Sequence, residues 1–227
     1  MQLLRYNPFN QIHKALRALL YDTALQIQRV DFSDDDATEI VLENVELVIL
    51  LFEGHAHVED TMVFPLIKDT APSIVASFEA QHEEDHSLAE LLSHSVKCCR
   101  KAARLDEKLF AGRGLLLAFN DFLAFNVKHM NEEETLVNGY LWKYFSDEEL
   151  MEHTKKIAAA IPPEKNMHYS KWMLKGLNNH EIFIWYSAIK HTAPAVVFNM
   201  FCDMAEKELE TSKWGTIKDV LQEGMLV

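Results

Sequence analysis

Three segments of this chain each carry two metal-binding side chains spaced by four residues. The pairs are His55 with Glu59, His82 with His86, and His129 with Glu133. In an α-helix, residues four apart lie one turn apart on the same face, so each pair can converge on one ion. One such pair is common by chance in a chain with 11 His and 35 Asp and Glu. Three such pairs in successive segments predict a fold that brings three helices together.

The spacing of apolar residues predicts four long helices. The chain has only seven Gly and six Pro, and long stretches contain neither. We expect helices over about residues 8–30, 36–67, 71–104 and 106–141, with Pro65 kinking or ending the second. Asn7 is the predicted N-cap of the first helix, and Pro8 is its predicted first residue. Short connections between long helices indicate an antiparallel up-down four-helix bundle, which we assign to residues 1–144.

Residues 145–227 have a different pattern, which predicts additional, shorter C-terminal helices. Ser146 with Glu149 forms a capping box, and further starts are indicated at Pro162-Pro163, Asn178-Asn179 and Ala193-Pro194. We expect these helices to pack on or beside the bundle, which makes the fold class all-α. No motif here indicates chemistry, and a homodimer or protein-partner surface is one use for them.

Charge and cysteine content exclude several classes of function. The formal net charge is -13, which disfavours binding to nucleic acid and to anionic membranes. The chain has three cysteines, which is a low and odd number, and it has no CxxC motif. Such cysteine usage is typical of proteins in a reducing compartment. The N-terminus lacks the features of a signal peptide, and the most apolar stretch, residues 45–52, is too short to span a bilayer. We therefore predict a cytoplasmic protein.

Each pair lies on the apolar stripe of its helix, and the first helix adds His13 to its own stripe. The same stripes predict inward positions for Met62, Ala89 and Leu136. All the candidate side chains should therefore point into the bundle. The predicted metal ligands are His13, His55, Glu59, His82, His86, His129 and Glu133.

The types of these ligands indicate which metal they hold. Five imidazoles and two carboxylates would cost many kcal/mol to bury without partners or a metal. Imidazole-rich sites suit iron, zinc, copper and nickel, and seven ligands exceed what one tetrahedral zinc needs. Two six-coordinate ions bridged by two carboxylates and one oxygen fit better. In that scheme one ion has three imidazoles, and the other has two and keeps a position for a small molecule.

The remaining candidates have less specific roles. We expect Glu132 and Glu134 to face solvent, unless the register differs by one residue, and His57 to lie at the surface or beside the ligands. Asp60, Asp85 and Glu90 are expected as hydrogen-bonding neighbours of ligands or as solvated groups. The histidines of the C-terminal third show no helical ligand spacing. The aromatic residues of the bundle are core residues, with walling of a ligand pocket as the alternative; they are Phe52, Phe119, Phe122 and Phe125.

Four segments together resemble the hemerythrin-like, HHE cation-binding family. They are NPFNQIHKALR, HAHVEDTMVFPLI, QHEEDHSLAELL and HMNEEETLVNGYLW, and they span residues 7 to about 142. The resemblance implies a centre of two non-haem iron ions, with a bridging oxo or hydroxo group, that binds dioxygen or related diatomics. It further implies the ligand sets, which are His82, His86 and His129 for one iron, His13 and His55 for the other, and Glu59 and Glu133 as bridges.

The function expected from this resemblance is binding or sensing of dioxygen or nitric oxide. One alternative is a redox or repair enzyme that reduces nitric oxide or peroxide, or donates iron to damaged iron–sulfur clusters. Another is a helical interaction module whose ions are structural. The extra C-terminal helices depart from the single-bundle oxygen carriers of the family. The sequence shows no flavin, haem or iron–sulfur motif that would supply electrons for turnover.

Overall fold

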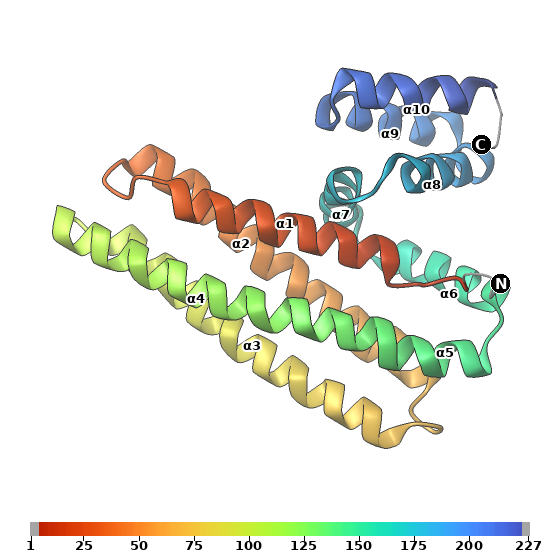
Figure 1. The fold of residues 1–227 in the computed structure, drawn as a ribbon, viewed down its shortest axis with the longest axis horizontal. Coiled ribbons are helices and arrows are strands. Elements are labelled where there is room, and N and C mark those ends of the chain that lie inside the picture. The colour runs from red at the N-terminus through yellow and green to blue at the C-terminus, as the bar shows by residue number, and fades with distance from the viewer. Residues whose placement is uncertain (1–4, 224–227) are drawn as a thin grey trace.

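Four long helices lie side by side in the computed structural model, which describes residues 5–223 (Figure 1). They are α1 (Asn10–Arg29), α2 (Asp35–Val58), α3 (Pro72–Lys101) and α4 (Leu105–Glu132). Short connections join consecutive helices, so neighbours run antiparallel. The described residues contain no strand. The all-α bundle with additional helices is therefore confirmed.

Both α2 and α4 continue into a widened turn at the same end of the bundle. After α2 come the π-helical turn η1 (Glu59–Val63) and the 3₁₀ turn η2 (Phe64–Leu66), which contains Pro65. After α4 come the π-helical turn η3 (Glu133–Val137) and α5 (Asn138–Tyr144). In each π-helical turn the carbonyl of the first glutamate accepts a hydrogen bond from the N–H five residues on. Such turns are rare and recur at functional sites.

Local side-chain hydrogen bonds set the starts of these helices. The Asp34 carboxylate accepts from the N–H of Ala37 and caps α2. Asn7 does not cap α1 directly, because its side chain accepts from the N–H of Phe9 at 2.9 Å within a turn that precedes the helix. Helix α1 therefore begins at Asn10, two residues later than the predicted first helical position, Pro8.

Two apolar clusters fill the interior of the bundle. One includes Leu16, Phe52 and Phe122, and the other includes Phe9 and Phe78 near the N-terminal end of α1. Burying each of these side chains stabilises the fold by about 1.5–3 kcal/mol. Along all four helices the inward histidines and glutamates lie between residues of the first cluster and residues of the second. Polar ligands are thus enclosed by apolar packing on both sides.

The C-terminal region forms a second group of helices with an apolar cluster of its own. They are α6 (Asp147–Ala160), α7 (Pro163–Gly176), α8 (Asn179–Thr192), α9 (Ala195–Glu208) and α10 (Thr211–Glu223). Leu174, Ile182, Tyr186 and Trp214 are among the residues of this cluster. The predicted capping box of Ser146 and Glu149 is present at the start of α6.

Helix α7 attaches this group to the bundle, where it packs against α1 (Figure 1). The Tyr169 hydroxyl donates a hydrogen bond of 2.6 Å to the backbone carbonyl of Leu51 in α2. Glu181, at the start of α8, accepts from Asn10 at 2.9 Å and forms an ion pair with Lys14. These contacts flank the parts of α1 and α2 that carry His13 and His55. Within residues 5–223, none of the helices combines the length and the hydropathy that crossing a membrane requires.

Candidate metal centre

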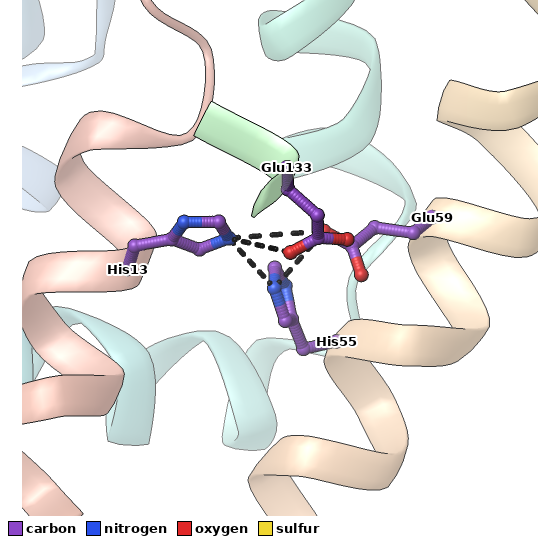
Figure 2. Close-up of side chains that lie close together, drawn as sticks. All are labelled: His13, His55, Glu59 and Glu133. Atoms are coloured by element: carbon purple, nitrogen blue, oxygen red, sulfur yellow. Dashed lines mark hydrogen bonds and ion pairs between the residues drawn. The ribbon is translucent and has the colours of Figure 1, made fainter. Parts of the chain in front are cut away.

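Six of the seven predicted ligands meet at one buried place between the four helices. His13, His55, Glu59 and Glu133 form one cluster, in which each residue offers a ligand atom within 4.8 Å of the others (Figure 2). The second cluster consists of Glu59, His82, His129 and Glu133. The two clusters share both glutamates. The site is therefore built as two histidine pairs joined by two carboxylates.

Glu59 directs one carboxylate oxygen towards each histidine pair. Its Oε1 lies 3.0 Å from Nε2 of His55 and 3.8 Å from Nε2 of His13. Its Oε2 lies 3.4 Å from Nε2 of His82. This orientation is the one that a carboxylate bridging two ions requires.

Glu133 likewise directs one carboxylate oxygen towards each histidine pair. Its Oε2 lies 3.4 Å from Nε2 of His13, and its Oε1 lies 3.2 Å from Nε2 of His129. Figure 2 shows Glu133 and Glu59 approaching the His13–His55 pair from separate helices. Each half of the site thus offers two imidazole nitrogens and one oxygen from each glutamate.

All four glutamate oxygens are buried, and none has a hydrogen-bond donor among the described residues. The imidazole nitrogens are near them, but not in hydrogen-bonding geometry. A buried carboxylate without partners costs several kcal/mol, so such a pair persists only when a positive charge compensates it. Bound cations between the two histidine pairs would supply that charge. The orphaned oxygens therefore fit a metal centre.

Three of the four imidazoles share an arrangement in which Nδ1 bonds to an oxygen-bearing side chain. The pairs and distances are His13 with Glu134 (3.0 Å), His82 with Asp60 (2.8 Å) and His129 with Gln81 (2.8 Å). These acceptors assign the proton to Nδ1 and leave the Nε2 lone pair directed into the site. Neighbours of this kind fix the orientation and tautomer of metal-binding histidines.

The Nε2 atoms face one another within each pair. His13 and His55 are separated by 3.1 Å between their Nε2 atoms, and His82 and His129 by 3.2 Å. In the second pair both Nδ1 atoms have acceptors, so two lone pairs would point at each other. That contact is unfavourable unless a proton or a metal ion lies between them. The imidazole geometry therefore agrees with the orphaned carboxylates.

The carboxylates raise the proton affinity of the imidazoles. Burial lowers the pKa of His13, but Glu134, Glu59 and Glu133 outweigh burial and raise this pKa to about 9. Burial likewise lowers the pKa of His82, and Glu59 and Asp60 raise it to about 9. Protonated imidazoles are thus an alternative to bound cations for balancing the buried carboxylates. A divalent cation can take over this role.

The π-helical turns change which residues face the interior beyond each glutamate. The sequence predicted Met62 and Leu136 as the next inward positions. Instead Val63 and Val137 are buried, and Leu136 is 47% exposed. A π-helical turn holds one more residue than an α-helical turn, so the inward position moves by one residue. The turns thus move the inward positions after Glu59 and Glu133 by one residue and leave the glutamates themselves in the predicted register.

The structure does not bring His86 to this site. Its side chain is 63% exposed, and its ring nitrogens lie 3.6 Å or more from Glu90 and Glu53. The buried positions of α3 alternate in steps of three and four, and the step after His82 reaches Asp85. The sequence placed His86 inward because it assumed a step of four. The set of three imidazoles expected at one iron is therefore reduced to His82 and His129.

Two polar neighbours of the site were not anticipated in these roles. Glu134 was expected in solvent, but it bonds to His13 and pairs with Arg17 at 2.7 Å. Burial raises the pKa of Glu134, and His13 and Arg17 lower it to about 2. Gln81 reaches across to His129. Their only sequence signal is that each directly adjoins a ligand residue.

Comparison with known proteins agrees with a cation-binding helical bundle. The model of the hemerythrin HHE cation-binding domain matches residues 6–141. F-box/LRR-repeat protein 5 of Pongo abelii is 23% identical over 81% of this chain and 29% of its own length. The same protein of Mus musculus is 23% identical over 75% of this chain and 24% of its own length. A zinc finger protein of Arabidopsis thaliana described as BRUTUS-like is 24% identical over 82% of this chain and 15% of its own length.

The fold and the site define a helical bundle with a buried histidine and glutamate cation site. The chain belongs to the hemerythrin HHE cation-binding domain family, because the family model covers more than half of it. It spans less than a third of the length of each of these three relatives. No solved structure matches the chain.

Proposed function

We propose that this chain holds two iron ions, bridged by Glu59 and Glu133, and uses them to bind or sense a small ligand such as dioxygen or nitric oxide. The observation that carries the proposal is that each glutamate directs one carboxylate oxygen towards each histidine pair. One ion would be held by His13 and His55, and the other by His82 and His129. The membership of the HHE family supports cations as the occupants.

The composition of each half supports iron. Two imidazoles with carboxylate oxygens, and further positions without a protein ligand, are typical of non-haem iron. An all-oxygen shell, which calcium and magnesium prefer, is absent from both clusters of described residues. When bound, iron would supply a redox-active Lewis acid that coordinates diatomic ligands.

This chain's own residues orient the ligands and exclude water. Glu134, Asp60 and Gln81 hold three imidazoles with Nε2 directed inward. Apolar residues on both sides, such as Phe9 and Leu16 around His13, limit access of solvent. A buried, pre-oriented site of this kind favours small ligands over bulky ones.

In this arrangement each ion would have four ligand atoms from the protein, two imidazole nitrogens and two carboxylate oxygens. A six-coordinate iron would therefore take its remaining ligands from outside the protein, including the proposed bridging oxo or hydroxo group. This differs from the sequence-based scheme, in which one ion had three imidazoles and no position for a small molecule. With His86 outside the site, both ions can bind an external ligand.

The test is iron analysis followed by exposure to a diatomic ligand. Protein produced in iron-supplemented cells and purified without oxygen should contain about two iron ions per chain. Admission of dioxygen or nitric oxide should produce visible charge-transfer bands. Iron at two per chain with no spectral change would contradict ligand binding, and absence of iron would contradict the whole proposal. Sustained consumption of nitric oxide or peroxide with a reductant would instead support the enzyme alternative.

A further inference from the structure

Asp85 and Asn126 form a buried polar pair in the layer next to His82 and His129. Asp85 is the inward residue that follows His82 on α3, and Asn126 is the inward residue that precedes His129 on α4. The Asn126 Nδ2 donates to Oδ1 of Asp85 at 2.6 Å and to the carbonyl of Phe122 at 3.1 Å. The carboxylate is therefore held in one orientation from α4.

Packing alone does not explain this pair. Asp85 is 5% exposed and Asn126 is 2% exposed, and the inward residues of the next layer are Ala89 and Phe122. Replacing a buried polar pair by apolar residues of similar volume is often neutral or stabilising. A buried carboxylate costs free energy that an apolar side chain would not, and the hydrogen bond from Asn126 offsets part of this cost. The pair is therefore a candidate for a role in the neighbouring site.

The Asp85 carboxyl group lies in the layer next to His82 and His129 and belongs to neither ligand cluster. Burial raises its pKa, whereas the hydrogen bond from Asn126 and the charges of His129, His82 and His55 lower it, and burial prevails. Asp85 is three residues from His82, and its partner Asn126 is three residues from His129, so the pair lies one helical turn from two proposed ligands. Neither ligand cluster includes Asp85. Its place is therefore beside the ligand atoms, not among them.

We infer that Asp85, oriented by Asn126, hydrogen-bonds to the small oxygen- or nitrogen-containing ligand that the metal pair takes from outside the protein. This inference rests on the proposed function and adds the class of ligand, which is one that accepts or donates a hydrogen bond. Asp85 is thus a positioning residue for the external ligand. The protein ligands of the metals remain the four histidines and two glutamates.

The experiment compares the wild type with Asp85→Asn and the control Glu90→Gln, which changes an exposed carboxylate on the same helix. Each protein is loaded with ferrous iron without oxygen, and nitric oxide is added as the probe. Iron per chain and the infrared N–O stretching frequency are then measured. We expect D85N to bind as much iron as the wild type and to show a shifted N–O frequency. E90Q should match the wild type in both.

Each contrary outcome has a distinct meaning. Loss of about half the iron in D85N would overturn the inference, because Asp85 would then be a metal ligand. A D85N variant with the iron content and the N–O frequency of the wild type would also overturn the inference, because Asp85 and Asn126 would then serve only to pack the helices. A wild type that takes up no iron would overturn this inference and the proposed function together. If D85N does not fold, Asn126→Ser keeps the carboxylate but removes its hydrogen bond, and an N–O frequency equal to that of the wild type would overturn the inference.

Discussion

Gly176, the last residue of α7, lies directly against the backbone of Lys14 in α1. A Cβ atom at this glycine would be 2.4 Å from the carbonyl oxygen of Lys14, a contact that real side chains do not make. Lys14 directly follows His13, so the C-terminal helices are seated on the turn of α1 that carries a proposed ligand. Absence of a side chain at position 176 permits this close approach.

Gly176→Ala should therefore destabilise the protein by about 1–3 kcal/mol, since either α7 or α1 must move. Gly139→Ala is the matched control, because a Cβ atom there meets nothing within 4 Å and position 139 lies within α5. That change should stabilise the helix by about 0.5–1 kcal/mol. Urea denaturation followed by circular dichroism measures both. Equal stability of the two variants would contradict the packing of α7 on α1.

His82→Ala should lower the metal content, whereas His86→Ala should leave it unchanged. The two histidines lie on the same helix, but the side chain of His82 is 8% exposed within the site and that of His86 is 63% exposed outside it. We expect H82A to lose about one of two ions, because its half retains a single imidazole. H86A should retain both. Metal analysis after gel filtration measures the ions retained by each variant. Loss of an ion in H86A would show that His86 is a ligand.

Glu134→Ala should weaken metal binding although Glu134 is not a proposed ligand. The substitution removes the acceptor of the Nδ1 proton of His13 and frees Arg17 from its ion pair. Loss of such an orienting neighbour typically costs 10–100-fold in metal affinity. Competition with a chromogenic chelator measures the affinity. Glu84→Ala, an exposed change on α3, is the control and should bind metal as the wild type does.

Removal of metal should lower the melting temperature. An ion present at about 100 times its dissociation constant stabilises the folded state by about 2.7 kcal/mol. For a protein of this size that corresponds to a decrease of about 5–10 °C for each ion removed. Thermal melts with and without a chelator provide the measurement, and addition of iron should restore the original value. An unchanged melting temperature would show that the site does not hold metal in the folded protein.

Much of the fold followed from local signals in the sequence. Apolar spacing predicted the four long helices, and the capping box of Ser146 and Glu149 marked the start of α6. Helix α3 begins at Pro72, within one residue of its predicted start. Such signals act within a few residues of the chain, so they can be read without knowledge of its tertiary contacts. The start of α1 was misplaced because Asn7 bonds within a preceding turn.

The register within the helices was only partly readable. A step of four from His82 reaches His86 and a step of three reaches Asp85, and both steps occur along a helix that packs in a bundle. The choice depends on how α3 is rotated against its neighbours, which no local pattern specifies. The π-helical turns after Glu59 and Glu133 shifted the inward position to Val63 and Val137 for a related reason. A shift of one residue in one turn leaves no mark in the spacing of the segments on either side.

Periodicity and side-chain type are local properties, and they were enough to place histidines and glutamates from four helices on interior faces. The packing of the helices was needed for the rest. It turns one oxygen of Glu59 and one of Glu133 to each histidine pair, leaves His86 outside, and gives Asp85 the interior position. These outcomes depend on distances between side chains far apart in the chain, and such distances are fixed only when the helices pack against one another.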